Sequence, residues 1–142
     1  MYSYRFLPFL FISFVAYSCA ENKIEVLHKE IMAVHDDIMP KTGEISYLYL
    51  SFRKKMETDS SISINQRKEL SEQADDLEKA EDEMMTWMND FISPQKLLAT
   101  KNEKEILSYL NEQKEVISRI KIHTETSLEK AEKLKKDLSI ND

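Results

Sequence analysis

Large apolar side chains recur at intervals of three and four along residues 24–52. The pattern keeps its phase through Pro40 and Gly43, because Ile38 and Ile45 lie seven residues apart. Heptad spacing of this kind is typical of a helix that packs along its length on other helices. The members of this stripe are Ile24, Leu27, Ile31, Val34, Ile38, Ile45, Leu48 and Phe52.

We therefore predict one long helix from about Asn22 to Glu57, kinked at Pro40. A proline cannot donate a backbone hydrogen bond and bends a helix that continues past it. Both Pro40 and Gly43 fall on the face away from the stripe, which favours a kink over a break. The alternative is a tight turn after Met39, because a residue before proline disfavours the helical conformation.

Two further stripes predict a second helix over residues 65–92 and a third over residues 101–138. Polar connections at 58–65 and 93–100 separate the three, and Thr100 with Glu103 forms a candidate capping box. Gln113, His123, Thr124 and Ser127 weaken the middle of the third stripe. The second stripe contains Leu70, Ala74, Leu77, Ala80, Met84, Trp87, Met88 and Phe91, and the third Ile106, Tyr109, Leu110, Val116, Ile117, Ile120, Ala131, Leu134 and Leu138.

Three long amphipathic segments with short links predict an all-α fold, an elongated antiparallel three-helix bundle. About 30 helical residues span about 45 Å, so the bundle is expected to be a rod. The alternative is a looser helix pair that completes its core by dimerising. A single glycine and only three prolines among 142 residues agree with a helical chain.

The first residues have the composition of an export signal. One basic residue, Arg5, precedes a run of twelve mostly apolar residues, 6–17, which is too short to span a bilayer. Ser18 and Cys19 follow, and Cys19 is the only cysteine. We predict a signal peptide over 1–18, lipidation of Cys19, a lipid-anchored tether over 19–22 and a bundle domain over 23–142. In the alternative, a simple signal peptidase cleaves after Ser18 and releases a soluble protein.

Charge and composition narrow the classes of function. The net charge of -6 disfavours general binding to nucleic acid, and Gly43 cannot supply a glycine-rich phosphate loop. Residues 65–92 contain nine acidic and three basic residues. A solvated helix face explains these acids, although a docking surface for a partner is the alternative. No spacing of serine, histidine and acid indicates a catalytic triad, so we expect no enzyme and no cofactor.

One cluster of side chains along the first helix resembles a metal site. His28, Met32, His35 and Met39 form a second stripe beside the heptad stripe, and His and Met together are ligands for copper or, as an axial pair, for haem. His123 or Met88 would add a ligand from across the bundle. The alternative is that these side chains only widen the packed face of the helix. A di-iron site is excluded, because the Glu25–His28 spacing has no second copy.

A methionine-rich patch near the end of the second helix offers a second candidate site. Adaptable methionine surfaces bind partners in some proteins, although at helical spacing such residues also build a core. The residues are Met84, Met85, Trp87, Met88 and Phe91, of which we single out the first four for partner binding.

Two blocks of sequence, residues 35–45 and 80–91, together with the lipobox-like start, carry a resemblance to a group of short lipoproteins of Bacteroidota bacteria. Some of these carry the label "viral A-type inclusion protein". The resemblance implies a lipid-anchored, all-helical protein outside the cytoplasm. We expect the outer membrane to be its location. It implies no activity, and no catalytic or binding residue comes with it.

These observations lead to two hypotheses of function. The first is a non-enzymatic envelope lipoprotein, held to the membrane through Cys19, whose bundle binds a protein partner or a second copy of itself. The second is a periplasmic metal or haem carrier that uses the His/Met stripe.

Overall fold

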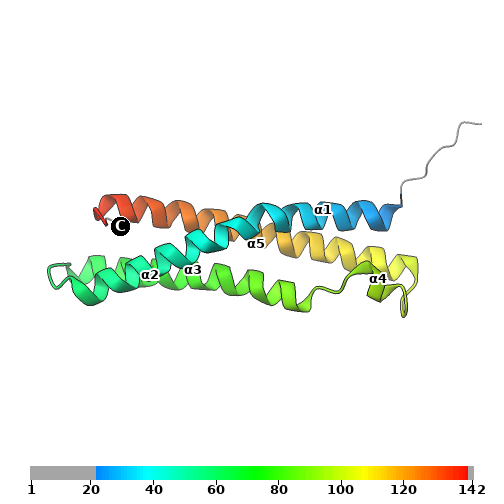
Figure 1. Cartoon of the computed structure of the whole chain (residues 1–142), viewed down its shortest axis with the longest axis horizontal. Coiled ribbons are helices and arrows are strands. Elements are labelled where there is room, and N and C mark those ends of the chain that lie inside the picture. The colour runs from blue at the N-terminus through cyan, green and yellow to red at the C-terminus, as the bar shows by residue number, and fades with distance from the viewer. Residues whose placement is uncertain (1–21, 141–142) are drawn as a thin grey trace, which may run out of the picture.

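The computed structural model describes residues 22–140, which fold into three antiparallel helical segments that lie side by side in an elongated rod (Figure 1). The predicted all-α, three-helix bundle is thereby confirmed. The predicted signal peptide and Cys19 lie outside the described residues. In chain order the elements are α1 (Lys23–Ile38), the 3-10 turn η1 (Met39–Lys41), α2 (Thr42–Thr58), α3 (Ile64–Asp90), α4 (Pro94–Leu97) and α5 (Glu103–Asp137).

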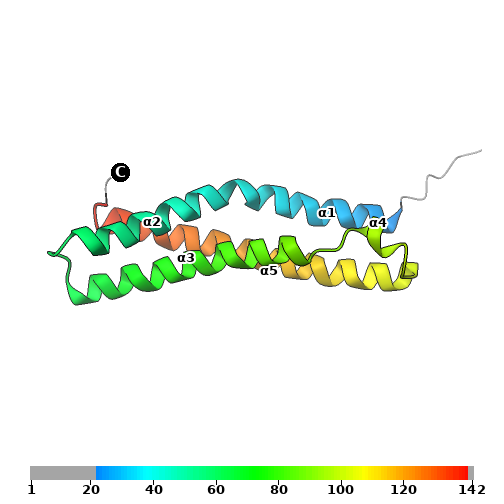
Figure 2. The same cartoon turned by 60° about the horizontal axis from the view of Figure 1, so that its bottom comes forward.

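The first segment runs along the whole bundle as α1, η1 and α2. Pro40 lies in the 3-10 turn, where it costs the helix one backbone hydrogen bond. The chain continues in the same direction past this turn (Figure 2), so the tight turn after Met39 does not form. The predicted kink at Pro40 stays a prediction.

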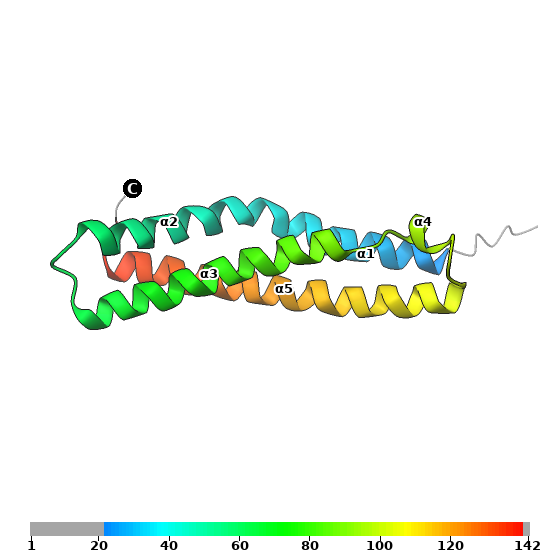
Figure 3. The same cartoon turned by 90° about the horizontal axis from the view of Figure 1, so that it is seen from below.

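The two halves of this first segment pack against different neighbours. Helix α1 packs mainly on α5, whereas α2 packs mainly on α3. Figure 3 shows α1 beside α5 at one end of the rod and α2 above α3 toward the other. The chain therefore changes partner helix at the level of Pro40.

Ion pairs repeat this change of partner. From α1, Glu30 pairs with Lys114 of α5 at 2.7 Å, and Asp37 pairs with Lys121 one heptad further on. From α2, Arg53 instead pairs with Asp75 of α3 at 2.6 Å. Surface ion pairs contribute little to stability, but opposite charges placed one heptad apart favour one register over others.

The core falls into two clusters that meet near the middle of the rod. One lies beneath α1 and contains Ile31, Ile38, Met84, Trp87, Leu97, Ile106, Leu110, Ile117 and Ile120. The other lies beneath α2 and contains Ile45, Leu48, Phe52, Leu70, Ala74, Leu77, Ala80, Leu128, Ala131 and Ile140. Burial of these stripes provides most of the stability, because isolated helices of this length are marginal in water.

The connection between α3 and α5 differs from the prediction. Helix α4 begins at Pro94 with Ser93 as its N-cap residue, so Ser93–Pro94 starts a short helix as well as following the end of α3. The predicted capping box at Thr100 and Glu103 is wrong. The amide of Thr100 bonds to the carbonyl of Leu97 in the turn that closes α4, and the capping box forms two residues later from Asn102 and Glu105.

Helix α5 ends in a tight reversal that adds a residue to the core. Ser139 has a left-handed backbone conformation, with φ 48°. The amide of Ile140 donates to the carbonyl of Lys135, and the amide of Ser139 donates to the carbonyl of Lys136. These two hydrogen bonds form a Schellman motif. The reversal turns Ile140 back so that only 9% of it is exposed.

Candidate partner-binding groove and the polar layer beside it

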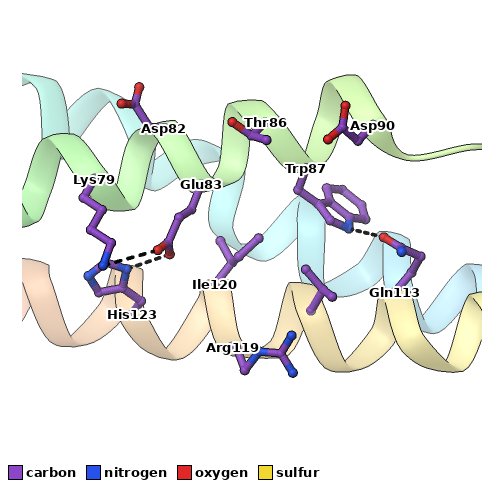
Figure 4. A pocket seen from close by; sticks show the side chains of 11 residues that line it. Lys79, Asp82, Glu83, Thr86, Trp87, Asp90, Gln113, Arg119, Ile120 and His123 are labelled. Atoms are coloured by element: carbon purple, nitrogen blue, oxygen red, sulfur yellow. Dashed lines mark hydrogen bonds and ion pairs between the residues drawn. The ribbon is translucent and has the colours of Figure 1, made fainter.

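A groove of about 750 Å³ runs between α3 and α5 on the α1 half of the rod (Figure 4). Its floor is apolar and is formed by Trp87, Val116 and Ile120. The indole Nε1 of Trp87 donates a hydrogen bond to Oε1 of Gln113 at 3.0 Å, so the ring is held between the two helices. An apolar floor with polar walls is the usual composition of a binding groove.

Several charged side chains line this groove without a partner among residues 22–140. Asp82, Asp90 and Arg119 line it, and among the described residues none of the three makes an ion pair or a side-chain hydrogen bond. Lys79 and Glu83 also line the groove but lie 3.9 Å apart and form an ion pair. Asp82, Asp90 and Arg119 are therefore available to an external partner.

One end of the groove is closed by His123, which lies between two carboxylates of α3. Its Nδ1 lies 2.8 Å from Oε2 of Glu83, and its Nε2 lies 3.2 Å from Oδ1 of Asp76. A carboxylate only accepts hydrogen bonds, so both contacts are hydrogen bonds when both ring nitrogens carry a proton. The geometry therefore favours the imidazolium form of His123.

The pKa values of this cluster agree with the geometry. Burial alone would lower the pKa of His123, but the hydrogen bonds and charges of Glu83 and Asp76 outweigh burial and raise that pKa above its usual value. For Asp76 burial acts in the opposite direction and would raise the pKa. Hydrogen bonds from Ser127 and His123 outweigh burial and lower the pKa of Asp76. His123 and Asp76 thus stabilise each other's ionised forms, and together with Glu83 they form a charged layer.

Ser127 and Thr124 extend this layer into the core. The hydroxyl of Ser127 donates to Oδ2 of Asp76 at 2.6 Å, and its carbonyl accepts a hydrogen bond from Nε2 of Gln73 at 3.2 Å. Thr124 is also buried, but its Oγ1 makes no hydrogen bond with any described residue. On α5 these residues lie between Ile120 and Leu128, where one core cluster gives way to the other.

The two histidines of the His/Met stripe lie against aromatic rings at the end of α3. The ring of His28 stacks on Phe91 with 6.0 Å between centroids and 9° between planes, and His35 lies 5.8 Å from the indole of Trp87. Nδ1 of His35 also lies 2.9 Å from Oδ1 of Asp36. Met32 of α1 and Met39 of η1 are both half-buried. Within residues 22–140 no group of three or more His, Cys, Asp or Glu side chains could hold a metal ion. Copper or haem binding by the stripe stays a prediction.

The methionine-rich patch divides between core and surface. Met84 is 1% exposed and Trp87 is 5% exposed, so both belong to the core of the α1 half. Met85 and Met88 are 46% and 38% exposed, and only these two of the four residues offer much surface to a partner. Partner binding by this patch stays a prediction and falls mainly on these two side chains.

Sequence reasoning missed the pairing of His123 with α3. His123, Thr124 and Ser127 interrupt an apolar stripe, which only signals weaker packing. Asp76 and Glu83 lie seven residues apart among many acids of α3, and this heptad spacing opposite a buried-face histidine was the available signal. The contact depends on the relative register of α3 and α5, which neither segment shows alone.

None of the helices in residues 22–140 is long and apolar enough to cross a membrane. The chain was also compared with known proteins. No family model matches it, and the curated proteins and the solved structures likewise gave no match. The resemblance to Bacteroidota lipoproteins accordingly remains a prediction from the two sequence blocks.

Proposed function

We propose that this protein is a non-enzymatic lipoprotein of the cell envelope whose helical bundle binds a protein partner. In this proposal residues 1–18 are a signal peptide, and a lipid on Cys19 holds the bundle to the outer membrane, outside the cytoplasm. Several acyl chains on one residue give stable membrane attachment, since each buried CH₂ contributes about 0.8 kcal/mol.

The groove between α3 and α5 is the observation that supports partner binding. Its apolar floor of Trp87, Val116 and Ile120 lies beside the charged Asp82, Asp90 and Arg119, which have no partner among the described residues. A partner helix could place apolar side chains on this floor and charged ones at its walls, as in other helix-in-groove complexes.

The polar side chains beside the groove support binding over catalysis. Both ring nitrogens of His123 are engaged by Glu83 and Asp76, so this ring has no free nitrogen to accept a proton from a substrate. The hydroxyl of Ser127 is fully buried and donates to Asp76, so it is unavailable as a nucleophile. The cluster therefore has a structural role in this proposal.

Site-specific photo-crosslinking in cells tests the proposal. A photoreactive amino acid replaces Thr86, an exposed groove residue, or Glu57, an exposed residue of α2 that serves as the control. We expect a discrete crosslinked product from position 86 and none from position 57. Its mass distinguishes a second copy of this chain from another protein.

A charge-reversal variant shows whether such a product depends on the groove. Arg119→Glu combined with Asp90→Lys inverts two charges that have no partner among the described residues, and it replaces no member of an ion pair of the bundle. We expect this variant to lose most of the crosslinking at position 86. Equal crosslinking from positions 86 and 57, or a product that survives the charge reversal unchanged, would contradict groove binding.

A further inference from the structure

Residues at one end of the rod combine basic and exposed apolar side chains. Residues 91–102, which contain α4, include Lys96 and Lys101 but no acidic residue, in a chain whose net charge is -6. Both lysines are exposed, and neither makes an ion pair with a described residue. Leu98 and Ile92, in the same stretch, are 62% and 42% exposed.

The connecting segment at the opposite end of the rod differs in charge. The connection between α2 and α3, residues 59–63, contains Asp59 and no basic residue, and Ile64, the first residue of α3, is 79% exposed. Exposed apolar side chains therefore occur at both ends, whereas lysines accompany them in the connecting segment only at the α4 end. This difference provides a matched control within one molecule.

The start of the described chain lies at the same end as α4. A shallow cavity of about 320 Å³ is shared by residues of both, among them Asn22, Ile24, Pro94 and Leu98. Figures 1 to 3 show the beginning of α1 next to α4 and the α2–α3 connection at the other end. Cys19 is three residues before Asn22, and three residues span at most about 11 Å.

We propose that the α4 end is a membrane-contacting surface, in which Leu98 and Ile92 enter the lipid headgroup layer and Lys96 and Lys101 bind anionic headgroups. This inference rests on the proposed lipidation of Cys19, which would hold Asn22, beside α4, within about 11 Å of the lipidated residue. Exposed apolar side chains beside lysines fit the interface of an anionic membrane. The rod then stands away from the membrane, and its α2–α3 connection points outward.

The test uses the lipidated full chain, purified from membranes and reconstituted into vesicles that contain phosphatidylglycerol. Lipidation consumes the Cys19 thiol, so Leu98→Cys or the control Ile64→Cys supplies the only free thiol for an environment-sensitive fluorophore. Nitroxide-labelled lipid quenches fluorophores near the headgroups. We expect at least three-fold stronger quenching at position 98 than at position 64. Adding Lys96→Glu and Lys101→Glu should reduce quenching at position 98 without changing it at position 64.

The outcomes separate this inference from the proposed function. If the chain is not recovered in the membrane fraction, the anchoring claim fails, and the inference that depends on it fails as well. If the chain is anchored but both labels are quenched equally, only the membrane-contacting surface is wrong. A label at position 98 that is shielded from iodide but unaffected by nitroxide lipid would show a protein contact there, which also overturns the proposal.

Discussion

The Nδ1 atom of His123 lies 2.8 Å from Oε2 of Glu83 and joins α5 to α3 near the point where the two core clusters meet. The second ring nitrogen faces Asp76, so the ring is held on both sides by acids. Lys130 contributes a further charge near Asp76, and Lys79 pairs with Glu83 from the same helix. This arrangement makes the stability of the bundle depend on pH.

We expect the free energy of unfolding to fall as the pH rises above about 6.5. The folded pKa of His123 is raised above the ordinary histidine value of 6.5, so its stabilising charge is fully present below that pH. This contribution is lost as the pH rises through the folded pKa. Urea unfolding at several pH values should show a loss of about 1 kcal/mol in wild type.

The variant His123→Gln should lack this loss, because its amide does not titrate. His28→Gln is the control, since His28 stacks on Phe91 and has no carboxylate contact among the described residues. That control should keep the pH dependence of wild type. A wild-type free energy of unfolding that stays constant as the pH rises above about 6.5 would contradict a stabilising role for charged His123.

Replacing Thr124 by valine should stabilise the bundle. The hydroxyl of Thr124 is buried without a hydrogen bond to any described residue, and valine has nearly the same shape without the polar atom. We expect a gain of about 1 kcal/mol in the free energy of unfolding. Ser127→Ala is the matched comparison and should destabilise by about 1 kcal/mol, because Asp76 loses a donor. A destabilising Thr124→Val would show that the hydroxyl has a partner in solution.

Replacing Pro40 by alanine should straighten the first segment and stabilise the fold. Alanine restores the backbone donor that proline lacks, and we expect a gain of about 1 kcal/mol in urea unfolding. Gly43→Ala, three residues on, is a control for helix propensity alone, because an added Cβ would meet no atom within 4 Å. Gly43→Ala should raise the free energy of unfolding by about 0.5–1 kcal/mol. A clear loss of stability in Pro40→Ala, without a loss in Gly43→Ala, would contradict this prediction. It would show that the first segment needs the proline where its packing partner changes from α5 to α3.

Copper should leave the thermal stability of the protein unchanged. His28 and His35 lie against Phe91 and Trp87, and a ligand role would require at least one ring to leave this packing. At equimolar Cu(I) the melting temperature should stay within about 1 °C of the metal-free value. A rise of several degrees that disappears in His28→Gln would support the metal-carrier hypothesis instead.

The apolar spacing was sufficient to predict the helices and most of the core. Ile31, Ile38, Ile45 and Phe52 are all buried, since a heptad stripe can form only one continuous packed face. The spacing also predicted correctly that the first segment continues past Pro40. Helix α4 was missed because four residues are too few to show a period, and the Ser-Pro pair that starts it is also a common stop signal.

The groove and its polar layer could not be predicted in the same way. They depend on which residues of α3 and α5 lie opposite one another, and this register is set by packing along the whole rod. His123 in an apolar stripe therefore suggested weaker packing of the third helix. In the structure His123 instead contacts two acids of α3. Trp87 was placed correctly on the stripe, but its bond to Gln113 depends on the same register.

Mass spectrometry of the mature protein, combined with membrane fractionation, determines whether a lipid on Cys19 anchors this protein. We expect a chain that begins at Cys19, carries a mass increase that matches diacylglycerol and acyl groups, and fractionates with the outer membrane. Cys19→Ser should abolish both the modification and the membrane retention. An unmodified chain in the soluble fraction, or unchanged membrane retention of Cys19→Ser, would contradict the account.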